Sequence, residues 1–155
     1  MSSPRFAVEP IVELPDRGLL LLLEASEREG FRFVRRVVEE WRRGIHRFDG
    51  PGERLLGAFV PAAGAVGLCG LMRDPYTAAP AVGRLRNLYV LPAHRRGGIG
   101  AALTRAVVDA ARGAFRLLRL RAGTPEAARL YERLGFAPAP AGSPDCTHVL
   151  ALDRG

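Results

Sequence analysis

The sequence predicts a mixed α/β fold in which one sheet carries helices on both of its faces. The predicted elements follow the order strand, two helices, three strands, helix, strand, helix and two strands. Strands therefore occur both in a run and in alternation with helices, which favours a mixed sheet. The length of 155 residues suits one domain that buries most of its apolar surface, so we expect residues 1–155 to form a single domain.

The first half of the chain is predicted to contain three strands and two helices. Residues 5–12 alternate apolar and polar side chains, as a strand does. Residues 19–29 form an apolar stretch that ends at a glycine, and residues 31–45 repeat apolar side chains at three- and four-residue steps, so both are predicted helices. After a turn rich in Gly and Pro, residues 55–60 and 65–72 are predicted as two strands of a hairpin.

The second half alternates strands and helices. Residues 84–91 are predicted as a strand, and residues 98–111 as a helix with one apolar stripe. Residues 115–121 form the next predicted strand. Residues 124–134 follow as a helix, with a threonine at the N-cap and a proline at the first helical position. The chain closes with two further predicted strands, residues 136–138 and 147–152.

The composition argues against several classes of function. All 23 basic residues are arginine, which beside the abundant Ala, Gly and Pro indicates GC-rich codon usage, so the net charge of +7 is weak evidence for nucleic-acid binding. The arginines are also spread over every element, whereas nucleic-acid-binding domains cluster them. No apolar run reaches the roughly 18 residues that span a bilayer, and Cys69 and Cys146 lack metal-ligand spacing. We expect a cytoplasmic protein without membrane, nucleic-acid or metal partners.

A glycine-rich turn between a predicted strand and a predicted helix suggests a phosphate site. Gly97, Gly98 and Gly100 leave the helix start without bulky side chains, so its unpaired N–H groups can close around an anion. Arg95 and Arg96 add positive charge. The Walker pattern and the dinucleotide pattern G-x-G-x-x-G are both absent, because the chain has no lysine and the glycine spacing differs. These features predict a diphosphate-binding turn.

Two segments resemble motifs of the GNAT superfamily of acetyltransferases. Residues 88–103 read LYVLPAHRRGGIGAAL, and residues 95–100 match the core Q/R-x-x-G-x-G/A of its acetyl-coenzyme A motif. Residues 126–136 read EAARLYERLGF, which is similar to the family signature A-x-x-L-Y-E-x-L-G-F. The motifs cover about residues 84–136. The resemblance implies the GNAT fold, a central, mixed and mostly antiparallel seven-stranded twisted sheet flanked by about four helices.

The resemblance also implies acetyl-CoA as co-substrate and a set of contact residues. The diphosphate would lie on the turn and the pantetheine arm would pair with the backbone of the preceding strand, which would also polarise the thioester carbonyl. Tyr131 would protonate the departing thiolate, unless its ring merely packs in the last helix. Thr124 stands where many relatives carry Asn. The expected cofactor-binding residues are Leu88, Tyr89, Val90, Arg95, Arg96, Gly97, Gly98, Ile99, Gly100, Ala101, Thr124 and Ala127.

The base that would accept the amine proton is left open by the sequence. Many relatives carry a Glu early in the strand before the turn, but the matching residue here is Arg84, which cannot accept a proton. A water chain could end on a backbone carbonyl, an acid of the N-terminal helices could reach the site, or the amine could already be partly neutral. The residues considered for this side of the site are Glu24, Glu39, Glu40, Trp41, His46, Asp49 and His148.

The predicted function is N-acetyltransfer from acetyl-CoA to a primary amine of a small molecule or peptide. The alternative is a module of the same fold that binds acyl-CoA without turnover, which the missing strand acid leaves open. The resemblance does not identify the acceptor. Because dimers are frequent in the family, a homodimer is also open.

Overall fold

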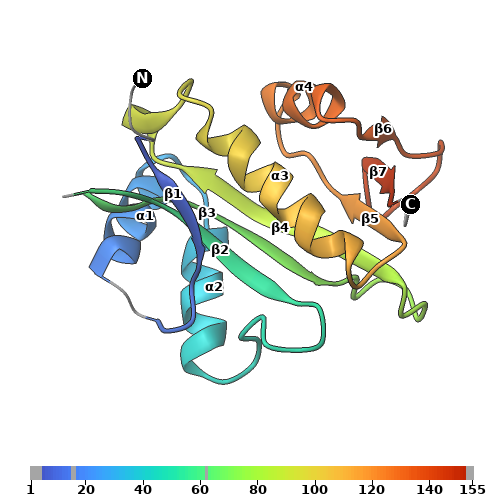
Figure 1. Cartoon of the computed structure of the whole chain (residues 1–155), viewed down its shortest axis with the longest axis horizontal. Coiled ribbons are helices and arrows are strands. Elements are labelled where there is room, and N and C mark those ends of the chain that lie inside the picture. Colours follow the sequence, from blue (N-terminus) through green and yellow to red (C-terminus); the bar gives the residue numbers. More distant parts are fainter. Residues whose placement is uncertain (1–4, 15–16, 62, 153–155) are drawn as a thin grey trace.

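The computed structural model describes residues 5–14, 17–61 and 63–152. Their strands form one seven-stranded sheet in the order β1-β2-β3-β4-β5-β7-β6 (Figure 1). Neighbouring strands are antiparallel except β4 and β5, which are parallel. The mixed, mostly antiparallel sheet that the resemblance implied is therefore confirmed. The strands are β1 (Ala7–Pro10), β2 (Arg54–Val60), β3 (Gly64–Arg73), β4 (Val82–Val90), β5 (Leu117–Leu120), β6 (Ala137–Pro138) and β7 (His148–Ala151).

Four α-helices in the described ranges flank this sheet. They are α1 (Arg17–Arg28), α2 (Phe33–Arg42), α3 (Ile99–Arg112) and α4 (Pro125–Arg133), and a short 3₁₀ turn, η1 (Pro92–His94), follows β4. Helices α1 and α2 lie on one face of the sheet, and α3 crosses the opposite face with α4 beside it (Figure 1). Helix α2 is shorter than the predicted 31–45, because the chain turns at Gly44, whose φ is +70°.

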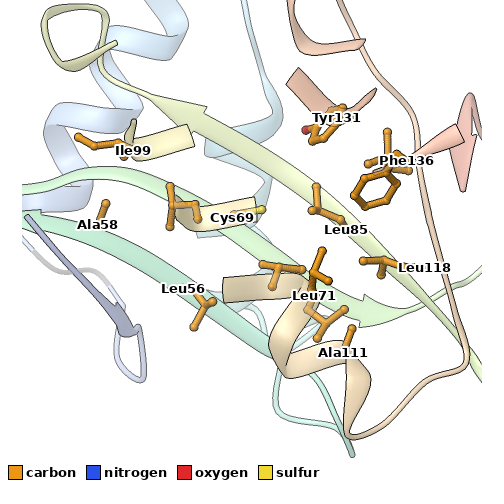
Figure 2. Packing of buried hydrophobic residues seen from close by; sticks show 14 of the residues in the cluster. Leu56, Ala58, Cys69, Leu71, Leu85, Ile99, Ala111, Leu118, Tyr131 and Phe136 are labelled. Carbon is orange, nitrogen blue, oxygen red and sulfur yellow. The ribbon is translucent and has the colours of Figure 1, made fainter. Parts of the chain in front are cut away.

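The two faces carry separate hydrophobic clusters. On the α3 side, Leu71 and Leu118 of the sheet belong to one cluster with Leu103 of α3, and all three are fully buried. Figure 2 shows Leu71 and Leu118 in this cluster. On the α1 and α2 side, Leu22 and Leu68 are likewise fully buried. Strand β3 is buried on both faces, which explains its nearly continuous apolar sequence. The central strands are thus held firmly from both sides, and the site is built at the end of β4.

Candidate active site

Strand β4 contains a β-bulge in its second half. The register with β3 shifts so that Cys69 stands opposite two residues of β4, Asn87 and Leu88. Asn87 has a φ of +64°, in the left-handed region that Asn tolerates better than most residues. A bulge bends its strand and redirects the side chains and backbone groups around it. The bulge therefore sets the direction in which the end of β4 leaves the sheet.

Strands β4 and β5 separate soon after they meet. Their parallel pairing covers only Val82 to Arg84 of β4, opposite residues 117–119 of β5. Beyond Arg84 the two strands diverge, so in the described part of the chain the edge of β4 that faces β5 has no further strand partner (Figure 1). Such an edge presents backbone N–H and C=O groups that can pair with an extended ligand.

The glycine-rich turn lies at the open end of this edge. Gly98 is the N-cap of α3 with a φ of +87°, and Arg96 has a φ of +69°. Within the described chain, the backbone N–H groups of residues 96–101 have no intramolecular hydrogen-bond acceptor. The first N–H groups of a helix lack partners by geometry and lie at the positive end of the helix dipole. The turn therefore presents a row of free donors suited to an anion.

Helix α4 packs against the start of α3, next to the glycine-rich turn. A Cβ placed on Gly100 would lie 3.6 Å from Cδ2 of Leu130, so the start of α3 lies against the residue that precedes Tyr131. Val90, Ile99 and Tyr131 also belong to one buried cluster. The tertiary structure thus brings together the end of β4, the glycine-rich turn and the predicted acid.

Tyr131 is almost completely buried, with 5% of its surface exposed. Its ring packs edge-on against Phe136 with 5.7 Å between the centroids, and its hydroxyl points away from Phe136 (Figure 2). Burial, followed by the nearby Cys69 thiol, raises the pKa of the hydroxyl far above its usual value. No hydrogen bond to another described residue engages this hydroxyl. Tyr131 therefore keeps its proton at neutral pH.

The side chain of Arg95 is engaged by the protein itself. Its Nη2 and Nη1 donate to the two carboxylate oxygens of Glu29 at 2.6 and 2.9 Å, and its Nε donates to the carbonyl of Val90 at 3.0 Å. Tyr89 adds a hydroxyl donor to Oε1 of Glu29 at 2.5 Å. These hydrogen bonds, Arg95 first and Tyr89 second, lower the pKa of Glu29. Arg96, by contrast, has no ion-pair partner within the described ranges.

A comparison with known protein families identifies the domain. A model of the acetyltransferase (GNAT) domain matches residues 52–138, more than half of the chain. The chain belongs to the GNAT acetyltransferase family. No curated protein sequence gives a significant match.

Solved structures give the same GNAT fold. A protein assigned as an acetyltransferase from Exiguobacterium sp. 255-15 is 28% identical, with a TM-score of 0.83 over 94% of this chain and 93% of that chain. A GNAT acetyltransferase from Staphylococcus aureus Mu50 is 16% identical, with a TM-score of 0.74 over 96% and 99%. YhbS from Escherichia coli, a GNAT N-acetyltransferase solved with CoA, is 17% identical, with a TM-score of 0.69 over 99% and 86%.

In this GNAT enzyme, Arg84 is part of a buried charge network. Asp74, which has no exposed side-chain surface, lies 3.4 Å from Nη1 of Arg84 and 3.3 Å from Nε of Arg119. Arg84 also donates to the carbonyl of Asp145 at 2.5 Å and lies over the ring of Tyr76. Arg84 therefore joins several elements and offers no proton acceptor. The sequence had no feature that marked Asp74 as its partner.

The other polar candidates differ in their surroundings. Glu24 and Glu39 are exposed, and Glu39 lies 3.7 Å from Arg35. Nε2 of His148 lies 2.8 Å from the Glu132 carboxylate, which ties β7 to α4. Asp49 is also exposed. Of the acids considered from the sequence, Glu40 is the one that borders a cavity near the bulge.

That cavity, named here the bulge cavity, has a volume of about 170 Å³ and is bounded by α2, the loop after it, β3 and the bulged part of β4. Asn87 and Glu40 are among its lining residues, together with His46. A larger pocket of about 380 Å³ lies between α1 and η1, with Glu29 in its wall and mostly apolar neighbours. Of these two cavities, only the bulge cavity is lined by a residue of the β-bulge, Asn87.

The remaining predicted contacts occupy defined positions. Thr124 caps α4 as predicted, because its Oγ1 accepts from the N–H of Ala127 at 3.1 Å. The side chain of Tyr89 points to the α1 and α2 face, so its backbone is the part exposed to the open edge. Residues 5–14, 17–61 and 63–152 contain no cluster of three or more His, Cys, Asp or Glu placed to hold a metal. Over the same ranges, none of the helices has both the length and the apolar character of a membrane span.

Proposed function

We propose that this acetyltransferase transfers an acetyl group from acetyl-CoA to a primary amine. The observation that carries the proposal is the row of unpaired N–H groups over residues 96–101, at the end of a strand whose edge is open. The diphosphate of CoA would accept hydrogen bonds from these groups, with Arg96 as the nearby unpaired cation. The pantetheine arm would pair with the backbone of β4 around Leu88 and Val90.

The open edge of β4 also suits the reaction itself. The thioester carbonyl would accept a backbone hydrogen bond near the bulge, and this bond would strengthen as negative charge develops on the oxygen. The carbonyl of Val90 already accepts from Arg95, which leaves one further lone pair of that oxygen for the pantetheine arm. Asn87 of the bulge also lines the bulge cavity, so an acceptor bound there would lie near the proposed position of the thioester.

The transfer would proceed by direct attack. The amine nitrogen forms a bond to the acetyl carbon, the carbon–sulfur bond breaks, and sulfur leaves with its electron pair. Tyr131 gives its proton to that sulfur and regains one from solvent. The nitrogen loses one proton to become the amide, so an amine that enters as an ammonium releases one net proton. The buried and unbonded hydroxyl of Tyr131 supports its role as the acid.

Two measurements test the function in sequence. Acetyl-CoA should raise the melting temperature, since a ligand at 100 times its Kd stabilises the native state by roughly 2.7 kcal/mol. Release of free CoA thiol should then depend on an added amine and exceed the hydrolysis seen without one. A melting temperature that acetyl-CoA does not move would refute the cofactor site. A shift without amine-dependent thiol release would instead favour the non-catalytic acyl-CoA-binding module.

A further inference from the structure

The bulge cavity combines buried apolar side chains with charged ones. Phe48 and Met72, which line it, are only 7% and 8% exposed. Arg36, Glu40 and Arg86 line it as well, and each of them has more exposed surface. A small molecule that entered would lose water from its apolar part and would still meet ionic partners.

Its two arginines lack the carboxylate partners that three other arginines of the structure have. Arg84, Arg95 and Arg119 each face an acid within 3.5 Å. Arg86 reaches only the sulfur of Met72, at 3.3 Å, and sulfur is a weak acceptor. The side chain of Arg36 makes no hydrogen bond or ion pair with any described residue. Two guanidinium groups at one small cavity therefore retain most of their donors for a ligand.

Glu40, the one acidic residue that lines the bulge cavity, also lacks a charged partner among the described residues. Glu40 has no ion-pair partner in the described ranges, although Arg36 is on the same helix. His46 is committed elsewhere, because its Nδ1 accepts from the N–H of Phe48 at 3.2 Å and its Nε2 faces Glu53 at 3.7 Å. Of the cavity's titratable groups, the Glu40 carboxylate is the one available to receive a proton.

We propose that the acceptor is a single free amino acid whose carboxylate is bound by Arg36 and Arg86 and whose amine lies toward Glu40. This assignment rests on the proposed acetyltransfer. The two guanidinium groups match a carboxylate through paired N–H donors. Glu40 takes one proton from the ammonium and passes it to solvent, which leaves the neutral amine that attacks the acetyl carbon.

The charge and size of the cavity argue against other amines. Two unpaired arginines against one glutamate leave a net positive cavity, which repels polyamines and aminoglycosides. Drug-sized ligands occupy pockets of roughly 300 to 1,000 Å³, whereas this cavity has about 170 Å³. A single amino acid fits this limit better than a folded peptide end does.

The test uses matched acceptors with the full-length enzyme and acetyl-CoA. Each of phenylalanine, tyrosine and leucine is compared with its carboxamide and with the amine that lacks the carboxyl group. We expect kcat/KM for at least one of these acids to exceed that of its carboxamide by about 100-fold, as lost charge-assisted hydrogen bonds imply. In Arg86→Gln this ratio should fall below about tenfold. Arg42→Gln, an exposed arginine at the end of α2, serves as the control and should keep the ratio.

A second readout separates this inference from acetyltransfer itself. Calorimetry with the CoA-loaded enzyme should detect binding of the same amino acid, and Arg86→Gln should weaken it by at least about tenfold at an unchanged melting temperature. Binding that Arg86→Gln leaves intact, or a preference for polyamines or carboxamides, would overturn the carboxylate site while acetyltransfer stands. Amino-acid binding without any thiol release would keep the site and overturn the proposed function.

Discussion

Arg84 of β4 and Arg119 of β5 are partners in the last paired position before the two strands diverge, and the carboxylate of Asp74 lies within 3.5 Å of both. Two buried or half-buried arginines at adjacent positions would repel each other without this acid. Asp74 also accepts from the N–H of Tyr76 at 2.8 Å, so it fixes the turn after β3 as well. The Asp74 carboxylate therefore bridges β4 and β5 at the last position where the two strands are paired.

Replacing this carboxylate should destabilise the whole fold. Asp74→Asn keeps the shape and one acceptor oxygen, but it leaves two guanidinium groups without their anion, which costs about 3 to 5 kcal/mol. Urea unfolding measures the change. Asp109→Asn, at a carboxylate with 81% exposed side chain, should cost less than about 1 kcal/mol. Equal midpoints for the two variants would contradict the role given to Asp74.

The Glu29 carboxylate should make stability depend on pH. Its pKa is lowered below the usual 4.5 by Arg95 and Tyr89, so its contribution is complete above that value and is lost as pH falls through the lowered pKa. Glu29→Gln should cost about 0.5 to 1 kcal/mol at pH 7, a range set by its partial exposure. This difference from the parent should vanish in acid. Glu24→Gln, at an exposed glutamate of α1, is the matched control in the same melting series.

At Gly98, the positive φ rather than a lack of space should determine how a substitution affects stability. A Cβ would meet no atom within 4 Å at either Gly98 or Gly123, but only Gly98 has a positive φ, +87°. Gly98→Ala should therefore destabilise by about 1 to 2 kcal/mol, the cost of a left-handed conformation for an L-residue. Gly123→Ala should be neutral or stabilising. Similar thermal stabilities of the two variants would show that the turn can relax.

Charge at the turn should control cofactor affinity. A Cβ on Gly97 would have no neighbour closer than 3.7 Å, and the residue has no positive φ, so a side chain can begin there without a clash at Cβ or backbone strain. Gly97→Glu and Gly97→Gln add nearly the same bulk, but only Glu adds a negative charge beside the expected diphosphate. We expect Glu to weaken acetyl-CoA binding at least about tenfold more than Gln does. Calorimetric titration of both variants measures the two affinities for acetyl-CoA. Equal affinities would show that the diphosphate does not bind beside Gly97.

Loss of the Tyr131 hydroxyl should lower kcat and leave stability and cofactor affinity nearly unchanged. Because this hydroxyl bonds to no described residue, Tyr131→Phe should keep the melting temperature and the Kd for acetyl-CoA. Its kcat should fall by about 100-fold or more, as for other general acids. Tyr76→Phe, at an exposed ring, should retain kcat. An unchanged kcat in Tyr131→Phe would make Tyr131 a packing residue.

The sequence by itself determined the order of elements, the glycine-rich turn and the cap of α4. These features depend on neighbours within a few residues, such as the left-handed φ of Gly98 or the Thr124 bond to Ala127. Only the tertiary structure decided that Glu29 meets Arg95, that Asp74 lies between two arginines, and that Arg36 and Arg86 share a cavity. Those partners come from separate strands and helices, and side-chain pairing across elements follows from sheet order and register, which local propensities do not encode.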